Sequence, residues 1–341
     1  MPRTRGKLWR WIGLPIVVGA GALWTSLGTR WTLPSANVTP ERYELAGYWD
    51  GADVPGGKIH RPMGIAVAPN GDVYVTDART RVVCLHRDGR FIGQWGREGN
   101  GEGEFGKPTG VAVAPDGSVY VSDFDQDRIQ KFTADGTFLL AFGQSGDGAG
   151  QFDAPAGLSV DRNGFVYVAD FYQHRIQKFG PDGTFQQTIG RSGRLGDGRL
   201  HYPTGVAVTA DGSLLIADAY NYELQWFSDE GRPLRRRGFH LAWLWPRPSS
   251  SNKGFNVPTG VAVAPDGLIH VTDSGNHRIV MLSATGGYIA EWKVPDADPT
   301  IHSPEQIAIS PDGRTLYATD YAAGRIIILR RTSPAAPGAR S

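Results

Sequence analysis

One phrase recurs six times along the chain after residue 60. Each copy has a proline, an apolar run, an Asp-Gly or Asn-Gly turn, a second apolar run and a closing aspartate. The prolines are Pro62, Pro108, Pro155, Pro203, Pro258 and Pro304, and the closing aspartates are Asp77, Asp123, Asp170, Asp218, Asp273 and Asp320. The prolines lie 46, 47, 48, 55 and 46 residues apart. This period is typical of four-stranded propeller blades, and the 3.6-residue apolar periodicity of helical repeats is absent.

Each repeat divides into four short β-rich runs, which we call strands a to d. In the second repeat the predicted strands span 110–114, 118–122, 128–132 and 137–142. The a–b and c–d turns contain glycine, which adopts the positive φ of a tight hairpin without steric cost. The sequence therefore predicts an all-β fold, a six-bladed propeller over residues 41–331, with residues 332–341 as a disordered tail.

The sixth repeat has no strand d, because the chain after Arg331 continues as TSPAAPGARS. The segment 43–49, YELAGYW, resembles the predicted strands d FIGQWG and FLLAFG. We expect this N-terminal strand to complete the sixth blade. The ring would then have no open sheet edge at which it could split.

These motifs resemble NHL repeats, in which Pro-x-Gly-Ile/Val-Ala-Val, an Asp-Gly turn, Val-Tyr-Val-x-Asp and Arg-Ile-Gln-x-Phe follow in order. The last element stands as RIQKF at 128–132 and again at 175–179. The fourth repeat departs with Glu223 for the arginine, and the sixth with Gln306 for the glycine. The family includes RNA binders, protein-binding sensor domains and peptidyl-hydroxyglycine amidating lyases. The resemblance therefore implies a fold and leaves the activity open.

Charge and cysteine content restrict the classes of partner. The 35 Lys and Arg residues nearly balance the 34 Asp and Glu residues, whereas a nucleic-acid binder generally carries a basic field or stripe. Nucleic acid is thus not an expected partner. Cys84 is the only cysteine, which excludes an intrachain disulfide and a zinc site made of cysteines.

The N-terminal segment has the charge order of a signal peptide or a signal anchor. Four basic residues, Arg3, Arg5, Lys7 and Arg10, precede an uncharged run from 11 to 28. We expect residues 1–28 to anchor the chain in a membrane and 29–40 to be a linker. The propeller would then lie outside the cytoplasm, in the periplasm or the extracellular space. Cleavage near Ala20-Gly21-Ala22 is the alternative and would give a secreted protein.

The closing aspartate is followed four or five residues later by arginine in five of the repeats. We interpret this recurrence as a structural ion pair or a turn cap at the b–c connection. A calcium site is the alternative in the second repeat, where Asp123, Asp125 and Asp127 alternate as in a calcium loop. The glycine and glutamate of an EF-hand loop are missing there.

The two faces of the ring differ in their loops. The a–b and c–d hairpins share one face, and the longer b–c and d–a connections share the other, which we call the long-loop face. Ligands are expected there. Three histidines, His60, His201 and His302, stand two residues before a strand-a proline. They could bind zinc and leave a coordination position open, as in a metal-dependent lyase or hydrolase; solvated loop histidines are the alternative.

The connection after the fourth repeat is the longest and is rich in basic and aromatic residues. Its candidate binding residues are Arg235, Arg236, Arg237, Trp243 and Trp245. Such side chains suit a sugar, an acidic partner or anionic lipid headgroups, unless the tryptophans pack on the outer strands. Chain direction places this loop on the face away from the anchor. The leading hypothesis is a membrane-tethered module that binds a protein, peptide or glycan, and the enzyme is the alternative.

Overall fold

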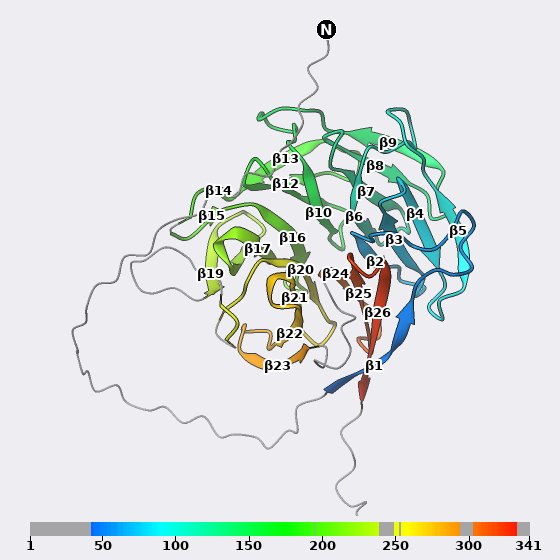
Figure 1. Ribbon diagram of the computed structural model, residues 1–341. Coiled ribbons are helices and arrows are strands. Elements are labelled where there is room, and N and C mark those ends of the chain that lie inside the picture. The colour runs from blue at the N-terminus through cyan, green and yellow to red at the C-terminus, as the bar shows by residue number, and fades with distance from the viewer. Residues whose placement is uncertain (1–41, 195, 239–248, 252–253, 294–302, 333–341) are drawn as a thin grey trace, which may run out of the picture. The chain divides into compact units, whose positions relative to one another are not determined.

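Six four-stranded antiparallel sheets are arranged around a channel (Figure 1). The computed structural model describes residues 42–194, 196–238, 249–251, 254–293 and 303–332. Each sheet is one blade, and the strands of blades one to five follow the chain from strand a to strand d. Strands a line the channel, which has a volume of about 200 Å³. The predicted all-β, six-bladed propeller is confirmed.

The strands of the first three blades are short and similar in length. Blade one contains β2 (Ile65–Val67), β3 (Val73–Asp77), β4 (Arg81–Leu85) and β5 (Phe91–Trp95). Blade two contains β6 (Pro108–Val113), β7 (Val119–Asp123), β8 (Arg128–Phe132) and β9 (Phe138–Phe142). Blade three contains β10 (Pro155–Val160), β11 (Val166–Asp170), β12 (Arg175–Phe179) and β13 (Phe185–Ile189).

The last three blades follow the same plan. Blade four contains β16 (Pro203–Val208), β17 (Leu214–Asp218), β18 (Glu223–Phe227) and β19 (Pro233–Gly238). Blade five contains β20 (Pro258–Val263), β21 (Ile269–Asp273), β22 (Arg278–Leu282) and β23 (Tyr288–Lys293). Blade six contains β24 (Pro304–Ile309), β25 (Thr315–Asp320), β26 (Arg325–Thr332) and β1 (Arg42–Trp49). Short parallel strands β14 (Arg191–Ser192) and β15 (Arg199–Leu200) pair within the connection between blades three and four.

Burial changes from the middle of a blade to its rim. Every residue of β3, β7, β11, β17 and β21, the strands b of blades one to five, is buried, because both faces of these strands pack against neighbouring blades. In contrast, β9 alternates between partly buried and exposed residues. Each core lies between two blades: Tyr74 and Cys84 of blade one pack with Val121 and Phe132 of blade two. The recurring apolar runs therefore form one continuous ring of interfaces.

The N-terminal strand closes this ring, as predicted. Figure 1 shows β1, in blue, beside β26, in red, and the two strands pair antiparallel from Arg42↔Thr332 to Trp49↔Ile326. A further bond joins blade six to blade one, in which the Thr319 hydroxyl donates to the Met63 carbonyl at 2.9 Å. The sixth blade is thus built from both ends of the propeller sequence.

Several sequence predictions fall on the ends of the chain. The predicted anchor (1–28), the linker (29–40) and residues 333–341 of the predicted tail lie outside the described residues. Thr332, the first residue assigned to that tail, is the last residue of β26. In the described ranges no helix has the length and apolar character needed to span a membrane.

Candidate binding face around the channel mouth

The closing aspartates hold together the two sets of loops that form the long-loop face. In every blade the carboxylate accepts a hydrogen bond from a backbone N–H of the d–a connection, at 2.7 to 3.3 Å. The pairs are Asp77 with His60, Asp123 with Gly106 and Lys107, Asp170 with Asp153, Asp218 with His201, Asp273 with Asn256, and Asp320 with Ser303. The predicted structural role of these aspartates is confirmed, but these bonds cap the d–a connection and not the b–c connection for which a cap was predicted.

The arginine that follows the aspartate holds the d–a connection from its other side. Arg81, Arg175 and Arg278 pair with the aspartates of their own blades at 2.9, 2.8 and 2.7 Å. Their other N–H groups donate to carbonyls of the preceding connection, which suits the planar five-donor guanidinium. Among the described residues, Arg128 makes such carbonyl contacts without a close ion pair, and Arg325 lies 3.7 Å from its aspartate.

Blade four lacks this arginine, because Glu223 occupies its position. The side-chain amide of Asn221 takes over part of the role: it donates to Asp218 at 2.8 Å and to the carbonyls of Gly193 and Arg199 at 3.1 and 3.2 Å. Burial raises the pKa of Asp218 well above its usual range. In the described part of the chain no cation forms an ion pair with Asp218.

The proposed calcium ligands are used for other contacts. The Asp123 carboxylate caps its own d–a connection, and the Asp127 carboxylate accepts from the backbone N–H of Ala154 in blade three at 2.7 Å. Within the described ranges, no three His, Cys, Asp or Glu side chains form a group that could hold a metal ion. The structure therefore does not bring Asp123, Asp125 and Asp127 together around a cation.

The three histidines of the zinc hypothesis are only partly described. His60 and His201 belong to blades one and four, on opposite sides of the ring, and His302 lies outside the described residues. His201 lies beside His174, with 4.9 Å between the ring centroids. Burial, Arg194 and His174 together lower the pKa of His201 to about 4, so its imidazole is neutral at pH 7. A zinc site of the three histidines stays a prediction.

The three consecutive arginines lie in a strand, which corrects their predicted place in a loop. All three belong to β19, the outer strand of blade four. Arg235 donates to the carbonyls of Ala284 and Thr285 in blade five at 2.8 and 2.9 Å, with its guanidinium 4.2 Å from the Trp226 ring centroid. Arg237 donates to the Gly286 carbonyl and Arg236 lies 3.4 Å from Asp197. Arg235 and Arg237 thus join two blades, while Trp243 and Trp245 lie outside the described residues.

Five aromatic side chains form a continuous arc on the long-loop face, and we call them the aromatic arc. They come from the loops of blades two, three and four: Phe124, Phe171, Tyr172, Tyr202 and Tyr220. Successive ring centroids lie 4.9 to 6.2 Å apart. All five are only partly buried. Such rings offer apolar faces on which a ligand group can stack.

Two charged side chains interact with the ends of the arc. The Lys107 ammonium lies 4.5 Å from the centroid of Phe124, a cation–π contact at one end. Glu305 of blade six interacts electrostatically with Lys107 and with Tyr220 at the other end. Burial raises the pKa of Glu305 to about 7, against the smaller opposing effects of Ser303 and Lys107. An aromatic surface and an acid that titrates near neutral pH therefore share one site.

Gln306 gives this site a floor. Its carboxamide donates to the Thr259 carbonyl of blade five at 3.2 Å, and a second contact of 3.5 Å reaches the Thr204 carbonyl of blade four. A Cβ on Gly157 of blade three would meet the same amide nitrogen at 3.4 Å. The side chain therefore extends across the channel from blade six, where the other inner strands have glycine.

Sequence reasoning distinguished the long-loop face and expected ligands there, but it did not identify the aromatic arc. The five residues occupy three different repeat positions: directly after the aspartate, two residues after it, and directly before the proline. They therefore do not recur as a motif. Comparing each position across the six repeats could have found them, because aromatic residues gather there in blades two to four.

The six blades and their capped loops define a closed six-bladed β-propeller with its candidate site at one mouth of the channel. The family model of the NHL repeat matches residues 105–132, 152–179, 200–227 and 255–281. These ranges fall on blades two to five. The protein is an NHL-repeat β-propeller.

Solved structures of diverse proteins are similar to this chain. A gluconolactonase from Xanthomonas campestris is 16% identical with a TM-score of 0.60, covering 87% of this chain and 96% of its own. Virginiamycin B lyase from Staphylococcus aureus is 17% identical with a TM-score of 0.55, covering 86% and 90%. A chain of a nidogen–laminin complex is 19% identical with a TM-score of 0.57, covering 72% and 84%. None of the curated proteins matches the chain. At these identities the likeness shows the fold alone.

Proposed function

We propose that the protein is a binding module that holds a glycan or peptide segment on its long-loop face. The aromatic arc supports this proposal, because five neighbouring rings remain partly exposed on loops that the buried closing aspartates cap. A rigid scaffold that presents variable loops is the usual arrangement of a binding site. Sugars and aromatic or cationic peptide side chains stack on such rings.

The charged side chains at the two ends of the arc would orient a bound ligand. Lys107 can pair with an acidic group of a ligand, and Glu305 can accept or donate a hydrogen bond according to its protonation state. Because Gln306 bridges the channel below them, a ligand would rest on this floor and would not thread the ring.

The N-terminal segment completes the proposal. Its charge order supports a tether that holds the propeller outside the cytoplasm. Fractionation of cells that express the full chain would find the protein in the membrane pellet, and release by salt alone would contradict the tether.

Binding to glycan and peptide arrays tests the role of the arc. We expect Tyr202→Ala combined with Tyr220→Ala to weaken capture about tenfold or more, because truncating a buried aromatic anchor typically costs more than ~1 kcal/mol. Leu139→Ala, at a side chain 47% exposed on the outer strand β9, is the control and should bind as the unmodified protein does. Equal binding by the double variant would place the ligand elsewhere.

An enzyme is the second candidate, and Glu305 is the observation that favours it. A carboxyl group with a pKa of about 7 can transfer protons efficiently at neutral pH. Two structural neighbours are a lyase and a gluconolactonase, so virginiamycin B and gluconolactone are the first substrates to assay. Turnover that is lost in Glu305→Gln while ligand capture remains would establish the enzyme. Capture without turnover would support the binding module.

A further inference from the structure

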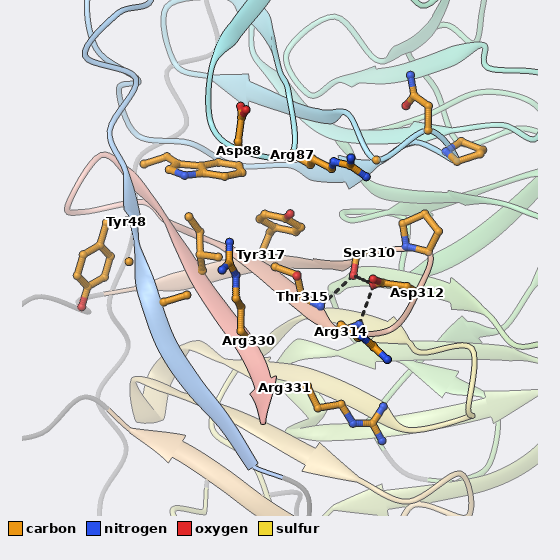
Figure 2. A pocket seen from close by; sticks show the side chains of 18 residues that line it. Tyr48, Arg87, Asp88, Ser310, Asp312, Arg314, Thr315, Tyr317, Arg330 and Arg331 are labelled. Carbon is orange, nitrogen blue, oxygen red and sulfur yellow. Dashed lines mark hydrogen bonds between the residues drawn. The ribbon is translucent and has the colours of Figure 1, made fainter. Parts of the chain in front are cut away.

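A cavity of about 720 Å³ lies at the seam between blades six and one (Figure 2). One wall consists of β1, β26 and the a–b hairpin of blade six. The other consists of the a–b and c–d hairpins of blade one. This seam site is therefore on the hairpin side of the ring, where the sequence predicted no ligand. It is also the place where the two ends of the propeller sequence meet.

The seam cavity is larger than the cavity of about 490 Å³ between blades four and five, where an arginine side chain takes up part of the space. Between blades four and five, Arg235 reaches across from the outer strand to two carbonyls. The outer strand at the seam contributes Ala46 and Gly47 instead, and a Cβ on Gly47 would meet nothing within 4 Å.

The tyrosine of strand b at the seam differs from those of blades one and two. In blades one and two its hydroxyl donates to a carbonyl of the next blade, from Tyr74 to Ala134 at 3.1 Å and from Tyr120 to Pro181 at 3.0 Å. Among the described residues Tyr317, the equivalent in blade six, makes no such bond to blade one. Its ring lies 5.3 Å from that of Trp49, so the cavity has an aromatic wall.

Positive charge at the seam exceeds what the neighbouring acids neutralise. Asp88 pairs with His86 and Arg90 at 2.8 and 2.9 Å, and Asp312 accepts from Ser310 and from the Arg314 backbone. Arg331 pairs with Asp266 of blade five at 2.6 Å.

Three lining arginines keep their charge available for a ligand. Arg87, Arg314 and Arg330 form no ion pair within the part of the chain that the structure describes, and each is exposed. Figure 2 shows the Tyr317 ring flanked by Arg87 and Arg330. Both guanidinium groups act electrostatically on its hydroxyl, so charge from both walls of the cavity meets at one point.

We propose that the seam site binds a small ligand through an anionic group, a phosphate, sulfate or carboxylate. Guanidinium groups bind such oxyanions through paired N–H donors. Trp49 and Tyr317 would contact a ring or apolar part of the same ligand.

The charges around the seam favour a small ligand over a membrane surface. Hairpins of blades two, three and four on this face carry aspartates whose pKa values hydrogen bonds hold below the usual range, among them Asp135, Asp182 and Asp211. They are ionised at neutral pH and would repel an extended anionic surface. A compact anion inside the cavity would approach the arginines without facing them.

Calorimetric titration of the full chain with phenyl phosphate tests the seam site. We expect saturable binding that weakens with salt, and a loss of affinity of about a hundredfold in Arg87→Gln combined with Arg330→Gln. Phenol, which lacks the anion, should bind weakly or not at all. Because the ligand would contact both blades, it should also raise the melting temperature of the unmodified protein.

The matched control is Arg232→Gln, an exposed hairpin arginine of blade four that pairs with Glu230. It should bind phenyl phosphate as the unmodified protein does. Absence of binding at millimolar concentrations, or equal affinity in the double variant, would overturn the proposal. So would arginine-dependent binding to phosphatidylserine vesicles without binding to phenyl phosphate, because the seam would then be a membrane contact. Circular dichroism of each variant confirms that the ring is folded.

Discussion

Asp218 of blade four is the one closing aspartate with a glutamate where five blades carry an arginine. Burial raises its pKa well above the usual carboxyl range, so the folded protein binds this proton more tightly than the unfolded chain. The contribution of Asp218 to stability is therefore greatest below the unfolded pKa of about 3.9 and is lost as the pH rises toward the folded value. We expect Asp218→Asn to be more stable than the unmodified protein, by a margin that is larger at pH 8 than at pH 5. Urea unfolding at the two pH values measures this difference.

The same change in blade five is the control. Asp273 pairs with the buried guanidinium of Arg278 at 2.7 Å. Asp273→Asn would leave that cation partly unpaired and should destabilise the ring by about 3 kcal/mol at both pH values. Equal effects of the two substitutions would contradict the inference that the buried charge of Asp218 lowers stability.

Individual residues show where sequence reasoning reached its limit. The closing aspartates were correctly interpreted because they recur, and a role repeated in every blade is structural. Glu305 could not be singled out, because burial raises its pKa and that burial exists only once the ring has assembled around it. Gln306 was noticed only as a missing glycine, and its bridge across the channel requires the other blades.

At the scale of elements, strand β21 carries the most unusual side chain of the blade interfaces. His270 is 1% exposed, and neither ring nitrogen has a hydrogen-bond partner in the described part of the chain. Its ring meets that of Tyr43 in the closing strand β1 edge-on, with 5.2 Å between centroids. Burial lowers the pKa of His270 to about 4, so protonation opposes the folded state.

We expect this histidine to make the closing strand sensitive to acid. A folded pKa below the unfolded value of about 6.5 means that stability is lost as the pH falls from 6.5 through 4, by up to ~3 kcal/mol. Hydrogen exchange in β1 should speed up over this range, while β9 on the far side of the ring stays protected. His270→Phe should remove most of the difference, and a persisting acid effect in β1 would assign it to other groups.

The elements themselves were largely predictable. Strand c of blade two was predicted at its observed bounds. Strand a was predicted to begin at residue 110, whereas β6 begins two residues earlier because Pro108 already pairs with Asp123 across the sheet. Strand β19 was missed, since three consecutive arginines give no apolar alternation. Its pairing with β18 and the contacts of Arg235 with blade five stabilise it.

For the whole molecule, the period of the repeat predicted the ring and the missing last strand predicted its closure. The period could do so because each blade packs only on its neighbours, so local patterns determine the architecture. The aromatic arc and the seam cavity could not be predicted, because they depend on which side chains meet across blades.

Truncation tests the closure. Removing residues 1–40 should leave a folded ring, whereas removing 1–50 also deletes β1 and exposes β26, whose residues Ile326 to Leu329 are buried. An unpaired edge with apolar faces should lower the melting temperature strongly and promote aggregation. Equal thermal stability of the two fragments would contradict a role of β1 in stability.

The closing pair also determines how the ring would respond to a pulling force. The chain enters β1 at Arg42 and leaves it at Trp49, so a load between the N-terminal end and the long-loop face acts along the strand axis. All the backbone hydrogen bonds between β1 and β26 would then share the load at once. A force that separated Arg42 from Thr332 sideways would break the same bonds one after another. The protein should therefore resist tension between its N-terminus and a captured ligand, and yield when its two termini are pulled apart.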